Sequence, residues 1–427
     1  MTNMKTTRRR FIGYLGGMAF IPYFACSAKP KARVVIVGGG FGGAVCANYI
    51  KLHDPAIEVF LLEKQKEYIS CPTSNYVIGG FKKMNKISHS YSGLEKNGIK
   101  VIHDELQNVD FDKKFIYLAS GEKLFYDRLV LSLGIDFDWS TIEGYDSKHI
   151  EKIPHAWKAG KQTIILSKQV QEMEDGGVVV ISSPEDPYRC PPAPYERASL
   201  IAYYFKQFKP KSKIIILDSK DKFTKKELFI EGWNKLYPGM IEWVPRSNGG
   251  HVNIVNPRDM TIGNDSVQLK ANIINLIPPQ TASSITIKLG LAGRDGWCEV
   301  NSFTFESRKA PYVHIIGDSI NPGDMPKSAF AANSHAKAAA VAIINLVNQK
   351  ELPVPVFANA CYSLLAPDYG ISINATYRAT DRKITAIIGG GGESPLSASE
   401  DLRKQEARHA RGWYKSIIGE TFFQRKS

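Results

Sequence analysis

The sequence predicts an α/β fold with two Rossmann-like, three-layer dinucleotide-binding domains and a carboxyl-terminal α+β domain. The first domain is indicated by a β-branched run at residues 33–37, which ends in a glycine-rich turn and continues into a helical pattern at residues 44–51. The second is indicated by buried-type strands at residues 176–181 and 213–218, whose composition suits neighbouring parallel strands. A length of 427 residues and a hydrophobic content of 43% allow two or three domains with ordinary hydrophobic cores.

The amino terminus has the pattern of a twin-arginine export signal over residues 1–30. Arg8, Arg9 and Arg10 precede an uncharged stretch, residues 12–28, that contains four Gly or Pro residues. This stretch is too short and too glycine-rich to span a membrane, and no later segment is expected to provide the roughly 18 apolar residues of a transmembrane helix. We therefore expect a periplasmic protein. A basic unstructured tail and lipidation at Cys26 are the alternatives.

Charge and cysteine content narrow the class of partner and scaffold. The formal net charge is +13 at pH 7, and the export signal contributes part of it. The other basic residues are spread along the chain, so an acidic protein surface or an anionic substrate is a better match than nucleic acid. Six cysteines are too few for a disulfide-stapled scaffold, although a cysteine pair can persist as a disulfide in the periplasm. No metal site is expected.

The glycine-rich turn places Gly38, Gly40 and Gly43 at the positions of a G-x-G-x-x-G motif. The first glycine allows the tight turn, the second lets a pyrophosphate approach the backbone, and the third lets helix and strand pack closely. Phosphate charge then meets the helix amino terminus. The next strand, residues 58–62, ends at Glu63, whose carboxylate is placed to accept the hydroxyls of an adenosine ribose. This part of the cofactor site is expected to contain Gly38, Gly40, Phe41, Gly43, Glu63 and Lys64.

Two later segments distinguish FAD from NAD. Residues 126–134, which end at Gly134, resemble the strand that returns to the nucleotide domain in two-dinucleotide flavoproteins. Residues 311–318 resemble the late motif of these proteins, in which Asp318, after Gly317, would hold the flavin ribityl chain. FAD is therefore the expected cofactor. The expected organisation is an FAD-binding domain in two segments, 31–150 and 277–349, a second domain at 151–276, and a carboxyl-terminal interface domain at 350–427.

The second domain lacks a glycine loop. A flavoenzyme that uses NAD(P)H would have such a loop directly after the strand at residues 176–181, but residues 182–192 contain four prolines and Cys190 instead. Proline has no backbone N–H and a fixed φ, so the segment is a poor phosphate cradle. Nicotinamide is therefore disfavoured as electron donor or acceptor.

Three cysteine-containing segments carry a resemblance to a known family. Residues 68–80, 189–198 and 359–364 resemble the corresponding segments of the flavoprotein subunit of flavocytochrome c sulfide dehydrogenase. The resemblance extends over nearly the whole chain after the export signal. It implies two glutathione reductase-type domains and FAD-dependent oxidation of sulfide, with electrons passed to a c-type cytochrome.

The same resemblance implies individual residue roles. Cys190 and Cys361 would form a redox-active disulfide beside the flavin, Cys71 would bond covalently to the flavin, and Glu196 would be a candidate acid or base. The sequence departs from the family pattern at Ala193, where a glycine is usual, and around Cys71.

Sulfur chemistry explains why a cysteine pair suits this role. A sulfur anion attacks one sulfur of a disulfide and leaves a persulfide on one cysteine and a thiolate on the other. With hydrosulfide as nucleophile, Cys190 or Cys361 would take the incoming sulfur, and Cys361 is the favoured flavin-facing sulfur. A thiol with a pKa of about 8.5 is mostly protonated at neutral pH, so the site requires a base or a positive charge, for which Glu196 and Arg197 are candidates. A merely stabilising bridge is the alternative.

The electrons must leave to an acceptor outside the chain. No Cys-x-x-Cys-His sequence occurs, so the chain carries no covalent c-type haem, and Cys46 and Cys298 are expected to be packed thiols. The family implies a separate periplasmic c-type cytochrome, docked partly through residues 350–427. Residues 378–383 and a helical run at 397–418 indicate an interface there. The basic residues that could steer an acidic cytochrome are Arg403, Lys404, Arg408 and Arg411.

Two other functions remain open at this stage. The first is a sulfide:quinone oxidoreductase, which would require amphipathic membrane-binding helices near the carboxyl terminus. For the basic residues named above, a solvated helix face is the alternative to a docking role. The second function is a non-catalytic flavin electron-transfer subunit. The apolar residues that leave a trace of a membrane-binding helix are Trp413, Ile417, Ile418, Phe422 and Phe423.

Overall fold

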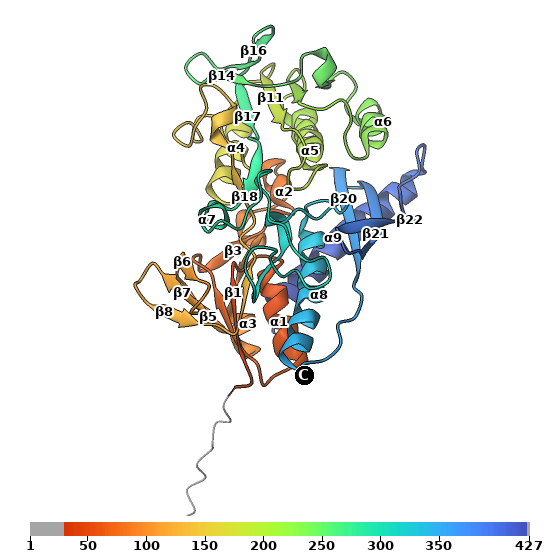
Figure 1. Cartoon of the computed structure of the whole chain (residues 1–427). Coiled ribbons are helices and arrows are strands. Elements are labelled where there is room, and N and C mark those ends of the chain that lie inside the picture. Colours follow the sequence, from red (N-terminus) through yellow and green to blue (C-terminus); the bar gives the residue numbers. More distant parts are fainter. Residues whose placement is uncertain (1–29, 425–427) are drawn as a thin grey trace, which may run out of the picture. The chain divides into compact units, whose positions relative to one another are not determined.

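The computed structural model describes residues 30–424 (Figure 1). From Lys31 onward the chain forms one compact unit, so the predicted domains are divisions within it. The predicted export signal and Cys26 lie outside the described residues.

A five-stranded parallel sheet contains the glycine loop. The hydrophobic run Arg33–Val37 forms its central strand β1, because a parallel strand is buried on both faces. Helix α1 follows the loop and packs against helix α8, while a small antiparallel sheet lies on the other side of the parallel strands (Figure 1). The strands, in sheet order, are β19 (Val313–Ile315), β9 (Arg128–Leu131), β1, β2 (Glu58–Leu62) and β5 (Lys100–Ile102). The covering elements are α1 (Gly43–His53), α3 (Ser92–Lys96), α8 (Ala329–Val347), β6 (Leu106–Asp110), β7 (Phe115–Leu118) and β8 (Lys123–Phe125).

The second parallel sheet has four strands, and the predicted pairing of its two buried strands is confirmed. Strand β11 (Val178–Ser183) pairs in parallel with β12 (Lys213–Asp218). The outer strands are β13 (Ile241–Val244) and β17 (Ile273–Leu276), and the helices are α4 (Lys161–Glu172), α5 (Ala193–Phe208) and α6 (Lys226–Leu236). A small antiparallel sheet consists of β14 (Ile254–Asn256), β15 (Thr261–Gly263) and β16 (Gln268–Lys270). The predicted α/β class with parallel sheets is confirmed.

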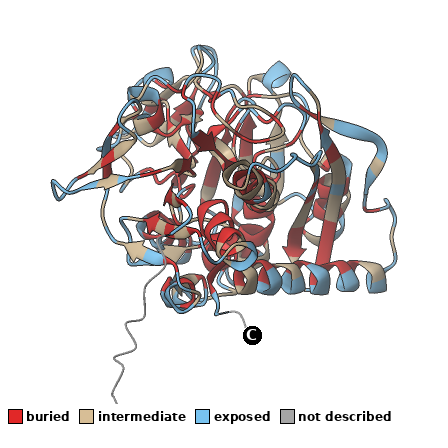
Figure 2. Ribbon diagram, turned by 60° about the horizontal axis from the view of Figure 1, so that its bottom comes forward, coloured by how far each residue is buried: buried red, intermediate tan, exposed pale blue. Residues whose placement is uncertain are grey.

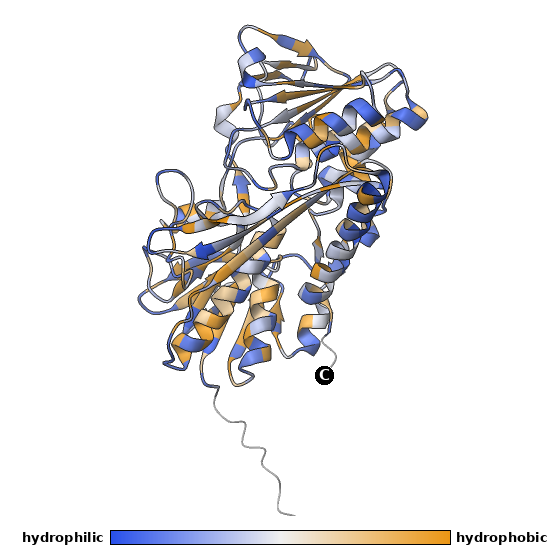
Figure 3. Cartoon of the chain, turned by 90° about the vertical axis from the view of Figure 1, so that its right-hand side faces the viewer, coloured by the Kyte–Doolittle hydropathy of each residue, from blue (hydrophilic) through white to orange (hydrophobic). Residues whose placement is uncertain are grey.

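Short elements connect the two parallel sheets. Strands β10 (Ile135–Phe137) and β18 (Gln280–Ala282) pair antiparallel where the chain leaves and re-enters the first sheet. The other short elements are β3 (Glu67–Ile69), β4 (Ser88–Ser90), α2 (Ser74–Ile78), α7 (Ser284–Lys288) and the 3-10 turns η1 (Met84–Lys86), η2 (Trp139–Thr141), η3 (Arg246–Asn248) and η4 (Gly317–Ser319). Buried residues concentrate on the parallel strands (Figure 2), where hydrophobic residues are also frequent (Figure 3).

The carboxyl-terminal part is an antiparallel sheet with a long helix packed on it. Its strands are β20 (Val356–Ala366), β21 (Tyr369–Ala379) and β22 (Ile384–Glu393), and the helix is α9 (Glu400–Phe422). The Ser399 hydroxyl accepts a hydrogen bond from the backbone N–H of Leu402 at 3.2 Å, and Glu400 and Asp401 lie in the first turn, as expected at a helix start. The helix begins and ends a few residues later than predicted.

One expectation for α9 is wrong, and the membrane-binding alternative finds little support in the burial of the helix. Arg403 is 1% exposed and forms ion pairs with Glu231 of α6 at 3.1 Å and with Glu406 at 3.2 Å, so it fastens the helix and cannot steer a partner. The apolar residues suggested as a membrane-binding trace mostly face the core, because Ile417, Ile418 and Phe422 are all buried. The one of them that is clearly exposed is Phe423.

Helix α8 is apolar enough and long enough to span a membrane by length and composition alone, which the sequence analysis did not anticipate. No other helix within residues 30–424 meets that criterion. In the fold, α8 packs against α1 and β20, and its alanine-rich face is buried. The small side chains let neighbouring elements approach closely, which suits a core helix.

Candidate active site

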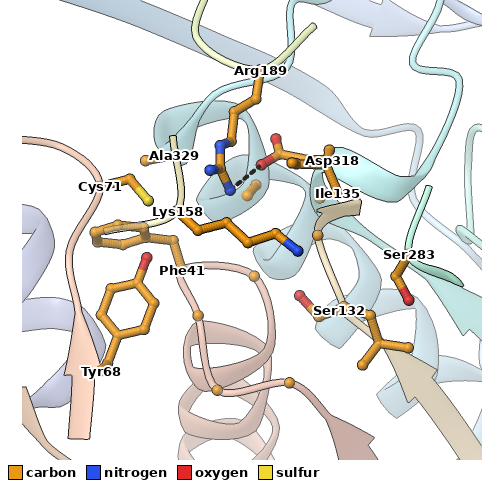
Figure 4. A pocket seen from close by; sticks show the side chains of 18 of the residues that line it. Phe41, Tyr68, Cys71, Ser132, Ile135, Lys158, Arg189, Ser283, Asp318 and Ala329 are labelled. Atoms are coloured by element: carbon orange, nitrogen blue, oxygen red, sulfur yellow. Dashed lines mark ion pairs between the residues drawn. The ribbon is translucent and has the colours of Figure 1, made fainter. Parts of the chain in front are cut away.

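A cavity of about 440 Å³ opens between the first parallel sheet, the loop after β3 and the start of α5 (Figure 4). We refer to it as the central cavity. Figure 4 shows Cys71, Phe41 and Tyr68 together on one side of the cavity, and Arg189, which shares the Trp157 carbonyl oxygen with Cys71, paired with Asp318. The predicted site residues that line it are Gly38, Gly40, Phe41, Glu63, Lys64, Cys71, Gly134, Cys190, Glu196, Gly317 and Asp318. Gly43 and Cys361 do not line it.

Two of the three motif glycines, Gly38 and Gly43, have no room for a side chain. A Cβ atom on Gly38, which has a φ of +98°, would lie 2.3 Å from the carbonyl oxygen of Ser132. A Cβ on Gly43 would lie 1.9 Å from the carbonyl oxygen of Gly38, so this glycine brings α1 against the loop rather than lining the cavity. The backbone N–H groups at the start of α1 are therefore left close to the cavity, as phosphate binding requires.

Glu63 lies beside this loop at the end of β2. One carboxylate oxygen accepts a hydrogen bond from the backbone N–H of Gly39 at 2.8 Å, and the other accepts one from Gln65 at 3.0 Å. These bonds hold the carboxylate at the cavity wall, where each oxygen retains a lone pair for a ribose hydroxyl.

Asp318 has a buried carboxylate oxygen with no hydrogen-bond partner within the described chain. Its other oxygen lies 3.9 Å from the Arg189 guanidinium, an ion pair drawn in Figure 4. Burial raises the pKa of Asp318, although Arg189 and Lys327 oppose the shift. A buried acceptor without a partner is costly, so a ligand hydroxyl is a natural complement.

The cavity therefore fits FAD. The loop at Gly38 and Gly40 and the helix start would hold the pyrophosphate, Glu63 the adenosine ribose, and Asp318 the ribityl hydroxyls. Its far end, near Cys71 and Cys190, would be left for the flavin ring.

Cys190 and Cys361 lie in hydrogen-bonding contact, although they are far apart in the sequence. Cys190 precedes α5 with a φ of +57°, and Cys361 lies on β20. Both thiols are free in the structure, as are the other cysteines within residues 30–424. Because Cys190 lines the cavity and Cys361 does not, the expectation that Cys361 is the flavin-facing sulfur is not supported.

The two thiols are electrostatically unequal. The interaction with the Cys190 thiol lowers the pKa of Cys361, and the nearby Lys225 ammonium lowers it further. The same interaction, together with burial, raises the pKa of Cys190. Cys361 is therefore the sulfur that carries negative charge more readily.

Glu196 is buried on α5 and connects the two cysteine segments. One carboxylate oxygen accepts a hydrogen bond from the backbone N–H of Leu364 at 3.0 Å, and the other accepts one from the Asn75 amide at 2.9 Å. Burial raises the pKa of Glu196. A carboxylate at the cavity wall with a raised pKa is suited to exchange protons with a sulfur substrate.

Arg197, the expected source of positive charge, uses its guanidinium to hold neighbouring segments together. Its guanidinium donates to the carbonyl oxygens of His155 and Ala156 and to the side-chain oxygens of Asn75 and Asn275. Burial lowers its pKa to about 10. The cation near Cys361 is instead Lys225, which no sequence motif identifies. The sequence analysis also did not name Arg189 and Asn75 as site residues, although each lies close in sequence to an expected cysteine.

Cys71 lies on the side of the cavity formed by Phe41 and Tyr68 (Figure 4). Its thiol is free and donates a hydrogen bond to the carbonyl oxygen of Trp157 at 3.6 Å. Thr73, two residues on, has a φ of +67°, so the backbone turns sharply after this cysteine. A covalent link from Cys71 to the flavin stays a prediction.

In the second domain, the carboxylate that could accept the ribose hydroxyls of a nicotinamide cofactor is already engaged by other side chains. Asp218 ends β12, where an acidic residue would accept ribose hydroxyls, and it is completely buried. Its carboxylate accepts hydrogen bonds from Tyr195 at 2.5 Å, Trp243 at 2.9 Å and Lys220 at 2.7 Å. Together with the proline-rich loop, this supports the prediction that nicotinamide is disfavoured.

Known proteins share these features with the chain. Models of the sulfide dehydrogenase (flavocytochrome c) flavoprotein chain match its central part at residues 163–278 and its flavin-binding part at residues 353–422, and a pyridine nucleotide-disulphide oxidoreductase model matches residues 32–170. The sulfide dehydrogenase (flavocytochrome c) flavoprotein chain of Chlorobaculum thiosulfatiphilum is 53% identical over 45 residues, which cover 94% of that sequence and 10% of this chain. The chain belongs to this family of flavoproteins.

Sulfide:quinone oxidoreductases are similar over a longer span. The mitochondrial enzyme of Mus musculus is 25% identical over 338 residues, or 72% of this chain and 70% of the relative. The solved sulfide:quinone oxidoreductase of Aquifex aeolicus superposes with a TM-score of 0.70 at 17% identity, covering 92% of each chain. Family membership makes the chain a flavoprotein oxidoreductase of a sulfide-oxidising group, and the solved structure supports the fold.

Proposed function

We propose that the chain oxidises sulfide through a disulfide between Cys190 and Cys361 and passes the electrons from FAD to a c-type cytochrome in the periplasm. The observation that carries the proposal is the contact of these two thiols at the wall of a cavity that fits FAD. A merely structural bridge would have no reason to lie at a cofactor cavity.

The unequal thiols indicate where hydrosulfide attacks the disulfide. Attack at Cys190 forms a bond from the incoming sulfur to Cys190, breaks the disulfide, and releases Cys361 as a thiolate. Cys190 lies on the cavity wall, and the lower pKa of Cys361 makes it the better leaving group. Glu196 takes the proton of the incoming sulfur species.

A second hydrosulfide attacks the outer sulfur of the Cys190 persulfide, releases a disulfane and leaves Cys190 reduced. Cys190 and Cys361 then form the disulfide again, and FAD, when bound, would accept the two electrons that this releases. The link from Cys71 would keep the flavin in place, and acid denaturation tests it: flavin should stay with the wild-type chain and separate from Cys71→Ala.

The main test measures flavin bleaching after anaerobic addition of sulfide. Cys190→Ser and Cys361→Ser should each lose on the order of 10³-fold or more in rate, because neither single thiol can form a disulfide. Cys298→Ala is the matched control, since Cys298 is a buried thiol that does not line the cavity. Unchanged bleaching in Cys190→Ser would exclude the disulfide mechanism.

Quinone is the second candidate acceptor, because the similarity to sulfide:quinone oxidoreductases covers more of the chain. We favour the cytochrome because the carboxyl-terminal helix buries Ile417, Ile418 and Phe422 and so lacks the apolar face that membrane binding requires. The test compares the rates at which one enzyme preparation reduces a c-type cytochrome and a soluble quinone with sulfide as donor. We expect the cytochrome to be reduced faster. The reverse preference would establish the quinone as acceptor.

The periplasmic location rests on the arginine run at Arg8, Arg9 and Arg10. Replacing Arg8 and Arg9 by lysine should keep the protein inside the cytoplasm. Export of that variant at the wild-type level would contradict the twin-arginine route.

A further inference from the structure

Lys225 lies beside the cysteine pair, although no motif in the sequence singles it out. It occupies the N-cap position of α6 and is 2% exposed. Its ammonium donates hydrogen bonds to the carbonyl oxygen of Cys361 at 3.1 Å and to the hydroxyl of Ser363 at 2.8 Å. Both acceptors belong to β20, so the contact joins α6 to the strand that carries one of the sulfurs.

This placement of a lysine is unfavourable for three separate reasons. A buried ammonium needs a negative partner, yet no carboxylate within the described residues lies within 4.0 Å of Lys225. A cation at the amino end of a helix also opposes the helix dipole, where Ser, Thr, Asp or Asn is preferred. Finally, its φ is +64°, in the left-handed region that a lysine rarely adopts. Local violations of this kind concentrate at functional sites.

The charged and titratable groups that influence Lys225 come from several elements. Cys190 and Glu196 approach from the start of α5, Cys361 from β20, and Glu393 from β22. Tyr377 of β21 is also influenced by Cys361. Glu196 already accepts hydrogen bonds from Leu364 and Asn75, so its charge is compensated elsewhere. Glu393 is exposed and has the smallest effect of the four groups. The remaining candidate for a counter-ion is therefore the Cys361 sulfur, where negative charge develops when the disulfide opens.

We propose that Lys225 is a positioning residue whose ammonium compensates the thiolate on Cys361. The proposal deepens and rests on the disulfide mechanism: hydrosulfide bonds to Cys190, the sulfur–sulfur bond breaks, and the electron pair of that bond stays on Cys361 next to Lys225. A fixed positive charge placed where negative charge develops lowers the barrier, because it needs no reorganisation during the reaction.

The ionisation equilibria of the site agree with this geometry. Burial lowers the pKa of Lys225, whereas the Cys361 thiolate opposes that shift more strongly than any other negative group. Lys225 in turn helps the Cys190 hydrogen bond to lower the pKa of Cys361. The ammonium and the thiolate therefore stabilise each other.

The test titrates Cys361 directly in the flavin-loaded protein after reduction with dithiothreitol. Alkylation of the Cys361 peptide by iodoacetamide is followed by mass spectrometry as a function of pH, because only the thiolate reacts. Lys225→Met should raise the alkylation midpoint by about one pH unit, since a nearby opposite charge shifts a pKa by that order. Lys225→Arg, which keeps the charge, should have an alkylation midpoint close to that of the wild type.

Lys226→Met is the matched control, because Lys226 is the next residue and its ammonium lies over the Trp243 ring at 4.5 Å, away from the sulfurs. It should leave the midpoint unchanged. Ser363→Ala removes one acceptor of the Lys225 ammonium and should raise the midpoint by a smaller amount, which keeps the proposal testable if Lys225→Met does not fold.

An unchanged midpoint in folded Lys225→Met, or in Ser363→Ala where Lys225→Met cannot be purified, would overturn the assignment. The titration uses no sulfide, so its result is independent of the proposed function. A wild-type protein whose flavin is not bleached by sulfide, but whose Cys361 midpoint still depends on Lys225, would refute the sulfide reaction and leave the role of Lys225 intact.

Discussion

The carboxylate of Glu196 accepts a hydrogen bond from the backbone N–H of Leu364 at 3.0 Å. Glu196 follows Cys190 on α5, and Leu364 follows Cys361 on β20, so this bond ties together the two segments that carry the sulfurs. Because the carboxylate is buried and also lines the cavity, it both joins the two sulfur-bearing segments and faces the cavity.

Glu196→Gln should alter the pH dependence of sulfide-driven flavin bleaching. Burial raises the pKa of Glu196 above its ordinary value of 4.5, so the wild-type rate should fall as the pH decreases through that raised pKa and the base takes a proton. The variant should be slower by about 10²-fold and lack this acid limb. Stopped-flow bleaching between acid and neutral pH measures both effects. An acid limb that persists in Glu196→Gln would assign it to another group.

The stability of the protein should respond to the same ionisation. Folding raises the pKa of Glu196, so the folded state favours the protonated carboxyl group. The contribution of this group to the free energy of unfolding is therefore present at low pH and is lost as the pH rises through the folded pKa. The wild type should therefore lose stability relative to Glu196→Gln as the pH rises, which thermal unfolding of both proteins measures.

Gly43→Ala should abolish flavin binding. The added Cβ would lie 1.9 Å from the carbonyl oxygen of Gly38, so α1 must move away from the loop. Gly412→Ala, on the exposed side of α9, meets no atom within 4 Å and should stabilise the protein by about 1 kcal/mol. The ratio of flavin to protein and the thermal unfolding midpoint distinguish these outcomes. Full flavin content in Gly43→Ala would contradict the predicted role of the loop.

Asp218→Asn should lower the free energy of unfolding by about 3–5 kcal/mol, because it breaks a buried ion pair with Lys220 and removes an acceptor of Tyr195 and Trp243. Denaturant unfolding measures the change. Asp112→Asn, at an exposed position, should change stability by no more than about 0.5 kcal/mol. Equal effects of the two substitutions would show that the Asp218 cluster does not stabilise the second domain.

Lys404→Glu combined with Arg408→Glu should slow electron transfer to an acidic cytochrome at low ionic strength. Both side chains are exposed on α9, unlike Arg403. The difference from wild type should vanish near 1 M salt, where the Debye length is about 3 Å. Lys222→Glu with Lys270→Glu, exposed on the second domain, is the charge-matched control. Equal slowing in both pairs would point to net charge rather than to docking through α9.

Local patterns predicted the fold and much of the cavity. The glycine spacing, the hydrophobic runs of β1 and β11 and the residues at strand ends are set by short-range geometry, so the positions of Gly38, Glu63 and Asp318 follow from sequence. These features are visible to periodicity because each depends on its own strand or turn.

The errors arose where distant elements meet. Arg403 follows the polar pattern of a surface helix, but Glu231 from α6 pairs with it and buries it. Lys225 gains its place only because the start of α6 approaches β20, and no local pattern encodes that approach. Which sulfur lines the cavity is likewise decided by the packing of β20 behind α5.

The ring of Phe422 packs against those of Phe41 at 6.2 Å and Tyr68 at 5.0 Å, behind the glycine loop. A segment of α9 thus supports from behind two residues, Phe41 and Tyr68, that line the cavity. During synthesis, a nascent polypeptide that has not yet reached Phe422 cannot provide this support, so tight capture of the cofactor must follow translation of nearly all the described residues. For the same reason, the nucleotide-binding sheet expressed as an isolated fragment should bind the flavin only weakly.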